Sequence, residues 1–253
     1  MPKQPRKSDR PRAALQTPAR PSAAAPANRA QARATRPGAS ATRAGEERKV
    51  ALEPGVWAEL PGRLCVVSGP SGVGKSTLAR RLLEDPRVKA RLSVSATTRD
   101  PRSGEEPGVD YHFISTPEFE RMRAASELLE WAEVHGHLYG TPCAPLRQSL
   151  AEGFCVLLVI DVQGGVQVKE RVPGALLVFV DPPSLEALEA RLRERGTDDD
   201  ATIRRRLENA RREIQEAKHH YPKHVINKNL DETLDQLVEH LRQHGCGVQN
   251  PDA

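Results

Sequence analysis

A glycine-rich segment of eight residues carries the strongest chemical signal in this chain. Gly69-Pro70-Ser71-Gly72-Val73-Gly74-Lys75-Ser76 matches the pattern G-x-x-x-x-G-K-[ST]. Its glycines let the backbone turn tightly, so that successive N–H groups point inward at phosphate oxygens. In this pattern Lys75 reaches the β- and γ-phosphates of a nucleotide, and the Ser76 hydroxyl binds Mg²⁺. The segment predicts binding of ATP or GTP, and the alternative is a glycine-rich turn with a solvated lysine.

Three polar stretches farther along the chain have residue types that grip a phosphorylated molecule. In the first, residues 93–105, Arg99 and Arg102 stand three apart and hydroxyl side chains come just before them. One guanidinium group can donate two parallel hydrogen bonds to the oxygens of a phosphate. Residues 110–113 and 130–141 add phenol, carboxylate and imidazole groups. Alone, each stretch is more typical of a solvated surface, but beside a phosphate-binding loop they indicate a site for a phosphate acceptor.

The elements that must position these residues alternate between strands and helices. Arg63–Ser68 is a short apolar run before the glycine-rich segment, and residues 154–160 and 175–180 form two more such runs. Continuous apolar runs of this length are typical of strands buried on both faces of a parallel sheet. Helical character is predicted for residues 77–83, 184–195 (ending at Gly196), 203–218 and 230–243. The sequence therefore predicts an α/β fold, with a parallel sheet flanked by helices.

Charge and composition divide the chain near its fiftieth residue. Residues 1–50 hold twelve Lys and Arg against three Asp and Glu, a net charge of +9, with no aromatic residue and a single leucine. The rest of the chain carries −5. A segment of the first kind cannot bury enough apolar surface to offset the entropy of ordering. We therefore predict a disordered basic tail over residues 1–55 and a folded domain over residues 56–253.

Composition also excludes several classes of protein. No apolar run reaches the roughly 18 residues of a membrane span, and no hydrophobic signal-peptide core follows Met1. The four cysteines form no C-x-x-C pair, and the apolar runs around Cys65 and Cys155 favour buried thiols in a reducing compartment. The acidic excess after residue 50 argues against a strongly basic nucleic-acid-binding domain. The tail alone could hold RNA or DNA, weakly and with strong salt dependence.

The tail also bears on localisation. Its Arg, Ala and Ser content resembles an organellar transit peptide. With seven prolines and no aromatic residue, however, it cannot form the apolar face of an amphipathic presequence helix. We therefore expect a cytoplasmic protein, with an organellar location as the alternative. Monomer and homodimer both stay open.

The stretch over residues 93–105 resembles a known family. Its residues Ser95, Arg99 and Arg102 fall in a segment similar to the S-V-S-x-T-T-R-x-P-R-x-G-E stretch of guanylate kinases, and the resemblance runs from about residue 62 to about residue 241. It implies phosphorylation of GMP to GDP, with ATP as co-substrate and Mg²⁺ as cofactor. The implied fold is a P-loop sheet flanked by helices, with a small GMP-binding insertion over about residues 95–145 and a helical lid over about residues 194–210.

The resemblance implies a role for each matching residue. Guanine presents N1–H and N2–H donors side by side, which suits the carboxylate of Glu130, whereas adenine has no proton on N1. Lid arginines would stabilise the charge of the transferring phosphoryl group. The implied catalytic residues are Lys75, Arg191, Arg195 and Arg206. The implied ATP-binding residues are Gly69, Pro70, Ser71, Gly72, Val73, Gly74, Lys75, Ser76, Thr77 and Asn227. The implied GMP-binding residues are Ser95, Arg99, Arg102, Tyr111, Glu130, Tyr139, Thr141 and Asp161.

The chain departs from the family pattern at two places. Val159 stands where the family usually has an acidic residue, and Lys228-Asn229 replaces an acidic pair. Two rival functions would require other residues at the implied site positions. A catalytically silent guanylate-kinase-like interaction module would have a degraded ATP loop, whereas residues 69–76 are complete. A related P-loop kinase of a phosphorylated sugar would lack the guanine-reading pair Glu130 and Thr141, so the residues favour a guanylate kinase.

Overall fold

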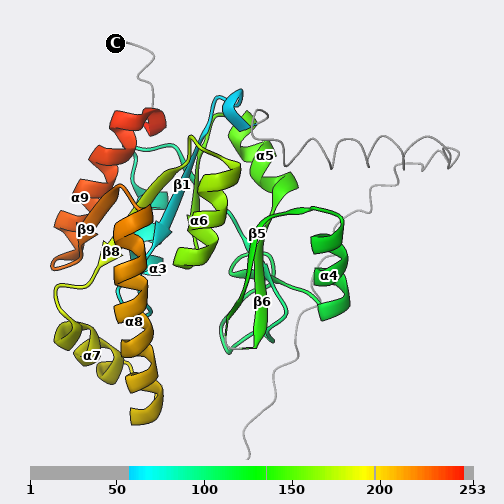
Figure 1. The fold of residues 1–253 in the computed structure, drawn as a ribbon. Coiled ribbons are helices and arrows are strands. Elements are labelled where there is room, and N and C mark those ends of the chain that lie inside the picture. Colours follow the sequence, from blue (N-terminus) through cyan, green and yellow to red (C-terminus); the bar gives the residue numbers. More distant parts are fainter. Residues whose placement is uncertain (1–56, 135, 197, 248–253) are drawn as a thin grey trace, which may run out of the picture. The chain divides into compact units, whose positions relative to one another are not determined.

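A five-stranded sheet forms the centre of the protein, whose computed structural model describes residues 57–134, 136–196 and 198–247. Its strand order is β2-β7-β1-β8-β9, and every neighbouring pair is parallel (Figure 1). The strands are β1 (Arg63–Ser68), β2 (Ala90–Leu92), β7 (Cys155–Val159), β8 (Leu176–Asp181) and β9 (Lys223–Ile226). The predicted α/β class with a parallel sheet is confirmed. The tail expected over residues 1–55 lies outside the described residues.

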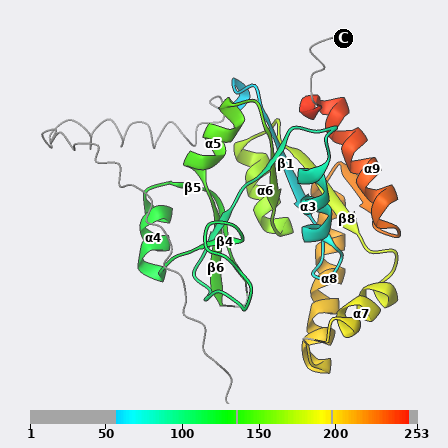
Figure 2. The same ribbon diagram turned by 180° about the vertical axis from the view of Figure 1, so that it is seen from behind.

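Helices cover both faces of this sheet, because successive side chains of a strand point to opposite sides. On one face, Val67 of β1 packs among residues of α3 and α9, and on the other, Val66 packs among residues of α5 and α6. Figure 1 shows the side covered by α6, and Figure 2 shows the side covered by α3. The four helices are α3 (Lys75–Glu84), α5 (Cys143–Ala151), α6 (Val162–Arg171) and α9 (Leu230–Leu241). Cys65 and Cys155 are buried in these layers, as their apolar runs predicted.

A second sheet of four strands, in the order β4-β3-β6-β5, is inserted between β2 and β7 in the chain. One helix, α4 (Thr116–Ala124), packs on it and buries Phe119 completely against Ala96 and Leu128. These residues form a hydrophobic cluster of their own, separate from the two clusters of the main sheet. The strands are β3 (Ser95–Thr97), β4 (Tyr111–Phe113), β5 (Leu128–Val134) and β6 (His137–Pro142).

Helices α7 (Leu185–Glu194) and α8 (Asp200–His220) extend past the carboxyl ends of the main strands (Figure 1). The side chains of Ser184 and Asp199 accept backbone N–H groups and so begin α7 and α8. Gly196 follows α7 with a φ of +66°, a left-handed conformation that ends a helix. The predicted helices over 184–195, 203–218 and 230–243 are confirmed, although α9 ends at Leu241 and gives way to a short π-helical turn, Arg242–Cys246.

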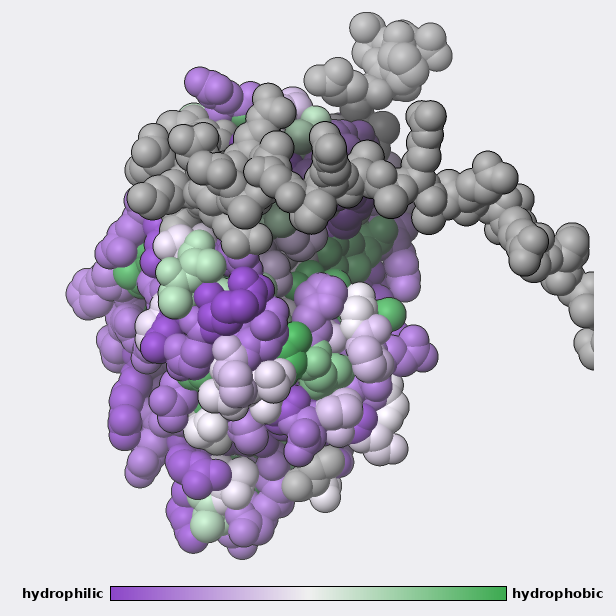
Figure 3. Space-filling model, turned by 90° about the vertical axis from the view of Figure 1, so that its right-hand side faces the viewer, coloured by the Kyte–Doolittle hydropathy of each residue, from purple (hydrophilic) through white to green (hydrophobic). Residues whose placement is uncertain are grey.

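The described part of the surface exposes few large hydrophobic side chains. Within the described ranges, no helix combines the length and the apolar character that a membrane span requires. Where grey atoms do not cover it, the side that carries the small sheet is mostly hydrophilic, with hydrophobic areas between the polar ones (Figure 3). Among the described residues, the exposed large hydrophobic side chains are those of Leu83, Val109 and Ile226, which belong to three different segments.

Candidate active site

A cleft of about 560 Å³ opens where the carboxyl ends of the main strands meet the small sheet and α8. Ligands of parallel α/β sheets bind at this edge. Its walls come from the glycine-rich loop, the small sheet, the end of β7, and the segment that joins α7 to α8. The expected site residues that line it are Gly69, Ser71, Lys75, Ser95, Arg102, Tyr111, Glu130, Tyr139, Asp161, Arg195 and Arg206.

Two expected site residues brace the glycine-rich loop from outside the cleft wall. The Nδ2 of Asn227 donates to the carbonyl of Val73 (2.8 Å), and Arg191 donates to the carbonyls of Val73 (3.3 Å) and Asn227 (2.8 Å). Gly74 has a φ of +106°, and a Cβ there would lie 2.7 Å from the Asn227 Nδ2. Only glycine suits this position, because a side chain would strain the backbone and displace the amide. Asn227 and Arg191 therefore act on the loop's backbone in this structure.

Lys75 begins α3 and turns its side chain back over the loop. Its Nζ donates to the carbonyls of Gly69 and Pro70. Burial lowers the pKa of Lys75, while the nearby carboxylates of Glu213 and Asp161 oppose that shift. The ammonium group thus lies at the mouth of the loop, beside a helix N-terminus that favours an anion.

Ser76 and Thr77 follow in the first turn of α3, where both are exposed and neither lines the cleft. The described part of the chain contains no group of three or more His, Cys, Asp or Glu residues that could hold a metal ion. The Ser76 hydroxyl and the Asp161 carboxylate, which lines the cleft, carry oxygen atoms, the type of ligand that Mg²⁺ takes together with phosphates and water. The donor set therefore fits a cation that arrives with nucleotide phosphates, and it does not fit an all-protein metal cage.

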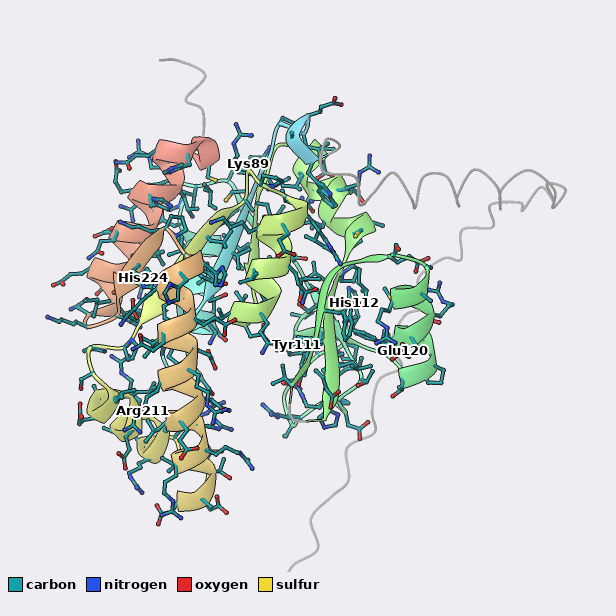
Figure 4. All side chains as sticks on the ribbon, viewed as in Figure 1. Lys89, Tyr111, His112, Glu120, Arg211 and His224 are labelled. Carbon is teal, nitrogen blue, oxygen red and sulfur yellow. The ribbon has the colours of Figure 1, made fainter. Side chains whose placement is uncertain are left out.

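A cluster of guanidinium and phenol groups lies on the small sheet. Arg99 makes two hydrogen bonds to the Glu105 carboxylate (2.9 and 3.0 Å) and one to the Tyr139 hydroxyl (3.2 Å). These bonds raise the pKa of Arg99 and lower that of Glu105. Arg99 does not line the cleft itself, whereas Tyr111 and Tyr139, whose rings pack edge to face at 5.9 Å, do. In Figure 4, Tyr111 lies on the side of the small sheet towards α8, and Glu120 lies on α4 at its other side.

Glu130 and Thr141 form a buried polar pair. Among the described residues, no other two expected site residues do so. Glu130 on β5 is 3% exposed, and its Oε1 accepts a hydrogen bond of 2.6 Å from the Thr141 hydroxyl on β6. Burial raises the pKa of Glu130 to about 7, although the bond from Thr141 opposes the shift. Gly164 was not among the expected site residues, yet a Cβ there would lie 2.7 Å from the Glu130 Oε2. Its missing side chain therefore leaves room for the carboxylate.

Arg206 joins α8 to the glycine-rich loop. Its guanidinium donates to the Ser71 hydroxyl (3.3 Å) and forms an ion pair with Asp198 (3.0 Å). The Asp198 side chain is only 7% exposed, and its second carboxylate oxygen has no hydrogen-bond partner within the described ranges. Sequence reasoning missed Asp198, and also Asn209 and Glu213, which line the cleft from α8. For Asn209 and Glu213 the available signal was their spacing from Arg206, since residues three and seven positions apart share a helix face. Asp198 precedes α8 and has no such signal.

Comparisons with known proteins identify the family to which the residues of this cleft belong. The family model described as guanylate kinase matches residues 61–244. A guanylate kinase of Oleidesulfovibrio alaskensis is 51% identical over 177 residues, which cover 70% of this chain and 84% of that protein. One of Thermosynechococcus vestitus is 50% identical over 177 residues, covering 70% and 92%. The crystal structure of a guanylate kinase from Anaplasma phagocytophilum matches with a TM-score of 0.61 at 34% identity, covering 76% of this chain and 92% of that one.

Proposed function

The chain belongs to the guanylate kinase family, and on that premise we propose how the residues of the cleft divide the reaction ATP + GMP → ADP + GDP. The protein is a nucleoside monophosphate kinase with ATP and GMP as substrates. The interaction-module and sugar-kinase alternatives lose their support, because relatives that span 70% of the chain are guanylate kinases. The observation that carries the division of roles is the buried Glu130–Thr141 pair, which lies on a different wall of the cleft from Lys75.

The small sheet binds GMP in this proposal. The Glu130 carboxylate accepts N1–H and N2–H of guanine, while Thr141 keeps that carboxylate oriented. The phosphate of GMP is held by side chains that line the same wall, and Arg99 orients one of them, Tyr139, from behind. The GMP-binding set is Ser95, Arg99, Arg102, Tyr111, Glu130, Tyr139, Thr141 and Asp161.

The glycine-rich loop binds ATP, and the phosphoryl group moves between the two walls. Lys75 leaves the loop carbonyls and turns to the β- and γ-phosphates when these arrive. Ser76 is the residue that would hold Mg²⁺, which, when bound with the nucleotide, neutralises charge on its phosphates. Arg195 and Arg206 stabilise the charge of the transferring group, and Arg191 holds the loop backbone in place. No covalent intermediate with a side chain is needed, because catalysis consists of positioning and charge stabilisation.

Two parts of the chain carry these roles as separate units. We place the GMP-binding insertion at about residues 95–145, where the small sheet and α4 lie. We place a lid at about residues 194–210, the end of α7 and the start of α8. Support for a lid comes from Arg206, whose contacts with Ser71 and Asp198 span from α8 to the loop. Its closure would exclude water from the transferring phosphoryl group.

Removing residues 1–50 is expected to leave both turnover and melting temperature nearly unchanged. That segment has no aromatic residue and one leucine, so it has little apolar surface to contribute to a core. Kinetics and thermal melts of the full-length and truncated proteins measure this. A drop of many degrees, or a large loss of turnover, would show that the segment packs on the enzyme.

Three further proposals concern location in the cell, oligomeric state and contact with nucleic acid. A cytoplasmic location is supported by a tail that cannot form an amphipathic presequence helix, and by four cysteines that are all buried. The enzyme acts as a monomer or homodimer. Weak contact with nucleic acid would come through the +9 tail and would fall steeply with salt.

The affinity of the protein for GMP, relative to AMP, is expected to fall as the pH drops through about 7. Burial raises the pKa of Glu130 to about 7, and only the ionised carboxylate accepts both guanine donors. At pH 6 about a tenth of the molecules are ionised there, so GMP should bind roughly tenfold more weakly than at pH 8. Adenine N1 can accept a hydrogen bond from the O–H of a neutral carboxyl group. Protonation of Glu130 should therefore not lower the affinity for AMP.

Calorimetric titration with GMP and with AMP, at pH 6, 7 and 8 and without ATP, measures this difference. The phosphates of the two ligands titrate alike, so the ratio of the two affinities isolates the base. A GMP:AMP affinity ratio that stays constant across this range would contradict the assignment of Glu130 to the base.

A further inference from the structure

Helix α8 directs three polar side chains into the cleft from one face. Arg206, Asn209 and Glu213 all line it, and their spacing places them on the same side of the helix. Glu213 shares the cleft with Lys75 at the glycine-rich loop and with Asp161 at the end of β7. It thus brings a second carboxylate to the part of the cleft where phosphates would bind.

The carboxylate of Glu213 has no partner of its own. It is half-buried, and among the described residues it makes neither a hydrogen bond nor an ion pair. Burial raises its pKa to about 7, with the charge of Lys75 opposing the shift and Asp161 and Glu216 adding to it. Its oxygens stay open to the cleft, since they are not among the fully buried polar atoms without a partner. With no donor among the described residues, this carboxylate is free to accept a hydrogen bond from a ligand in the cleft.

The surrounding groups narrow the identity of that donor. Nucleotide phosphates offer only acceptors, and they repel the carboxylates of Asp161 and Glu213, which the single charge of Lys75 offsets in part and a metal ion would offset further. Mg²⁺ keeps several of its waters when it binds with phosphates, and these waters donate hydrogen bonds. The side chain of Val159, which also lines the cleft, cannot accept one. Asp161 and Glu213 are the two lining carboxylates whose charges act on Lys75 at the loop.

We propose that Glu213 is a positioning residue for the metal–nucleotide complex, accepting hydrogen bonds from waters of the Mg²⁺ ion that ATP brings to the loop. The inference rests on the proposed placement of Mg²⁺ at Ser76. Glu213 lies on the same helix as Arg206, so its contact draws α8 towards a nucleotide that carries the metal. The same carboxylate repels metal-free phosphates, so α8 distinguishes the two forms of ATP.

The substitution Glu213→Gln tests this, with Glu216→Gln as the matched control three residues along the same helix. The measurement is the affinity for a non-hydrolysable ATP analogue, by calorimetry, with Mg²⁺ and with a chelator. In Glu213→Gln the gain in affinity on adding Mg²⁺ is expected to shrink about tenfold, the weight of one charge-assisted hydrogen bond. Metal-free binding is expected to stay equal or become tighter. Glu216→Gln should keep the wild-type gain, and GMP affinity should be unchanged in both.

Two outcomes separate this inference from the placement of the metal. If Mg²⁺ raises the affinity of Glu213→Gln for the ATP analogue as much as it does in the wild type, the role of Glu213 is overturned, while the placement of Mg²⁺ stands. If Mg²⁺ does not raise the affinity of the wild type for the ATP analogue, the placement of Mg²⁺, on which the role of Glu213 depends, is overturned. If Glu213→Gln fails to fold, Glu213→Asp replaces it, because its shorter carboxylate keeps the charge and should lose part of the gain. Glu213→Ala removes both the charge and the length of the side chain. If Mg²⁺ still raises the affinity for the ATP analogue by the wild-type factor in both Glu213→Asp and Glu213→Ala, the proposal is equally overturned.

Discussion

Replacing Lys75 with alanine will lower turnover by about a thousandfold or more and leave the affinity for GMP unchanged. The Nζ of Lys75 lies at the mouth of the glycine-rich loop, where no other cation of the loop itself can replace it at the β- and γ-phosphates. Removing one positioned donor to a developing charge costs about 10²–10³ in turnover, and here a full positive charge is lost as well. GMP binds to the small sheet in our assignment, so its affinity should not respond.

The matched control for this substitution is Lys89→Ala. Lys89 is exposed, donates to the carbonyl of Glu152 and lies at the end of the sheet away from the cleft (Figure 4). Losing the same charge there should leave turnover unchanged. Steady-state kinetics, with GMP affinity from calorimetry, compare the two variants. A well-folded Lys75→Ala protein that kept more than a few per cent of wild-type turnover would refute our placement of the active site.

Replacing Glu130 with glutamine will lower kcat/KM for GMP by roughly ten- to a hundredfold or more. The amide keeps the size of the side chain, but its NH₂ group faces a guanine donor at a position that is 3% exposed. A buried mismatch of this kind costs about 1–3 kcal/mol. AMP has an acceptor at N1 and a donor at its amino group, which suit an amide better than a carboxylate. The ratio of kcat/KM for GMP to kcat/KM for AMP should therefore fall, because the value for GMP decreases and the value for AMP increases.

Measuring kcat/KM for both nucleotides, in the wild type and in Glu130→Gln, decides this. Glu133→Gln is the matched control, because Glu133 lies on the same strand and is exposed. It should change neither value. If the GMP:AMP ratio were the same in wild type and Glu130→Gln, guanine specificity would have to come from another residue.

The main sheet and the glycine-rich loop could be predicted because their signals are local. Residues 63–68 and the runs around Leu157 and Val178 are apolar on both faces, and a strand buried on both sides requires that composition. The loop needs glycine where φ is positive, as at Gly74, so its pattern appears directly in the sequence. Helix α7 was predictable from its leucine spacing and from Gly196 after it, and α8 from its amphipathic pattern.

The small sheet and several of its contacts could not be predicted in the same way. Strands β3 and β4 have three residues each, too few to show a period of two. Glu105 and Gly164 belong to the site through contacts with Arg99 and Glu130, and the contact of Gly164 spans more than thirty residues of chain. Asp198 and Glu213 look like ordinary charged residues of a helical surface, and only the fold shows that they face a cleft.

The small sheet's hydrophobic cluster of Ala96, Phe119 and Leu128 has a consequence for how this enzyme can change over evolutionary time. Because the cluster is separate from the two that hold the main sheet, part of the small sheet's packing is independent of the main sheet, although Leu129, next to Glu130 on β5, packs in a main-sheet cluster. Substitutions within the cluster of Ala96, Phe119 and Leu128 can therefore alter the small sheet without changing the packing of Val73 in the glycine-rich loop. This separation lets the acceptor site evolve while the ATP-binding loop keeps its structure.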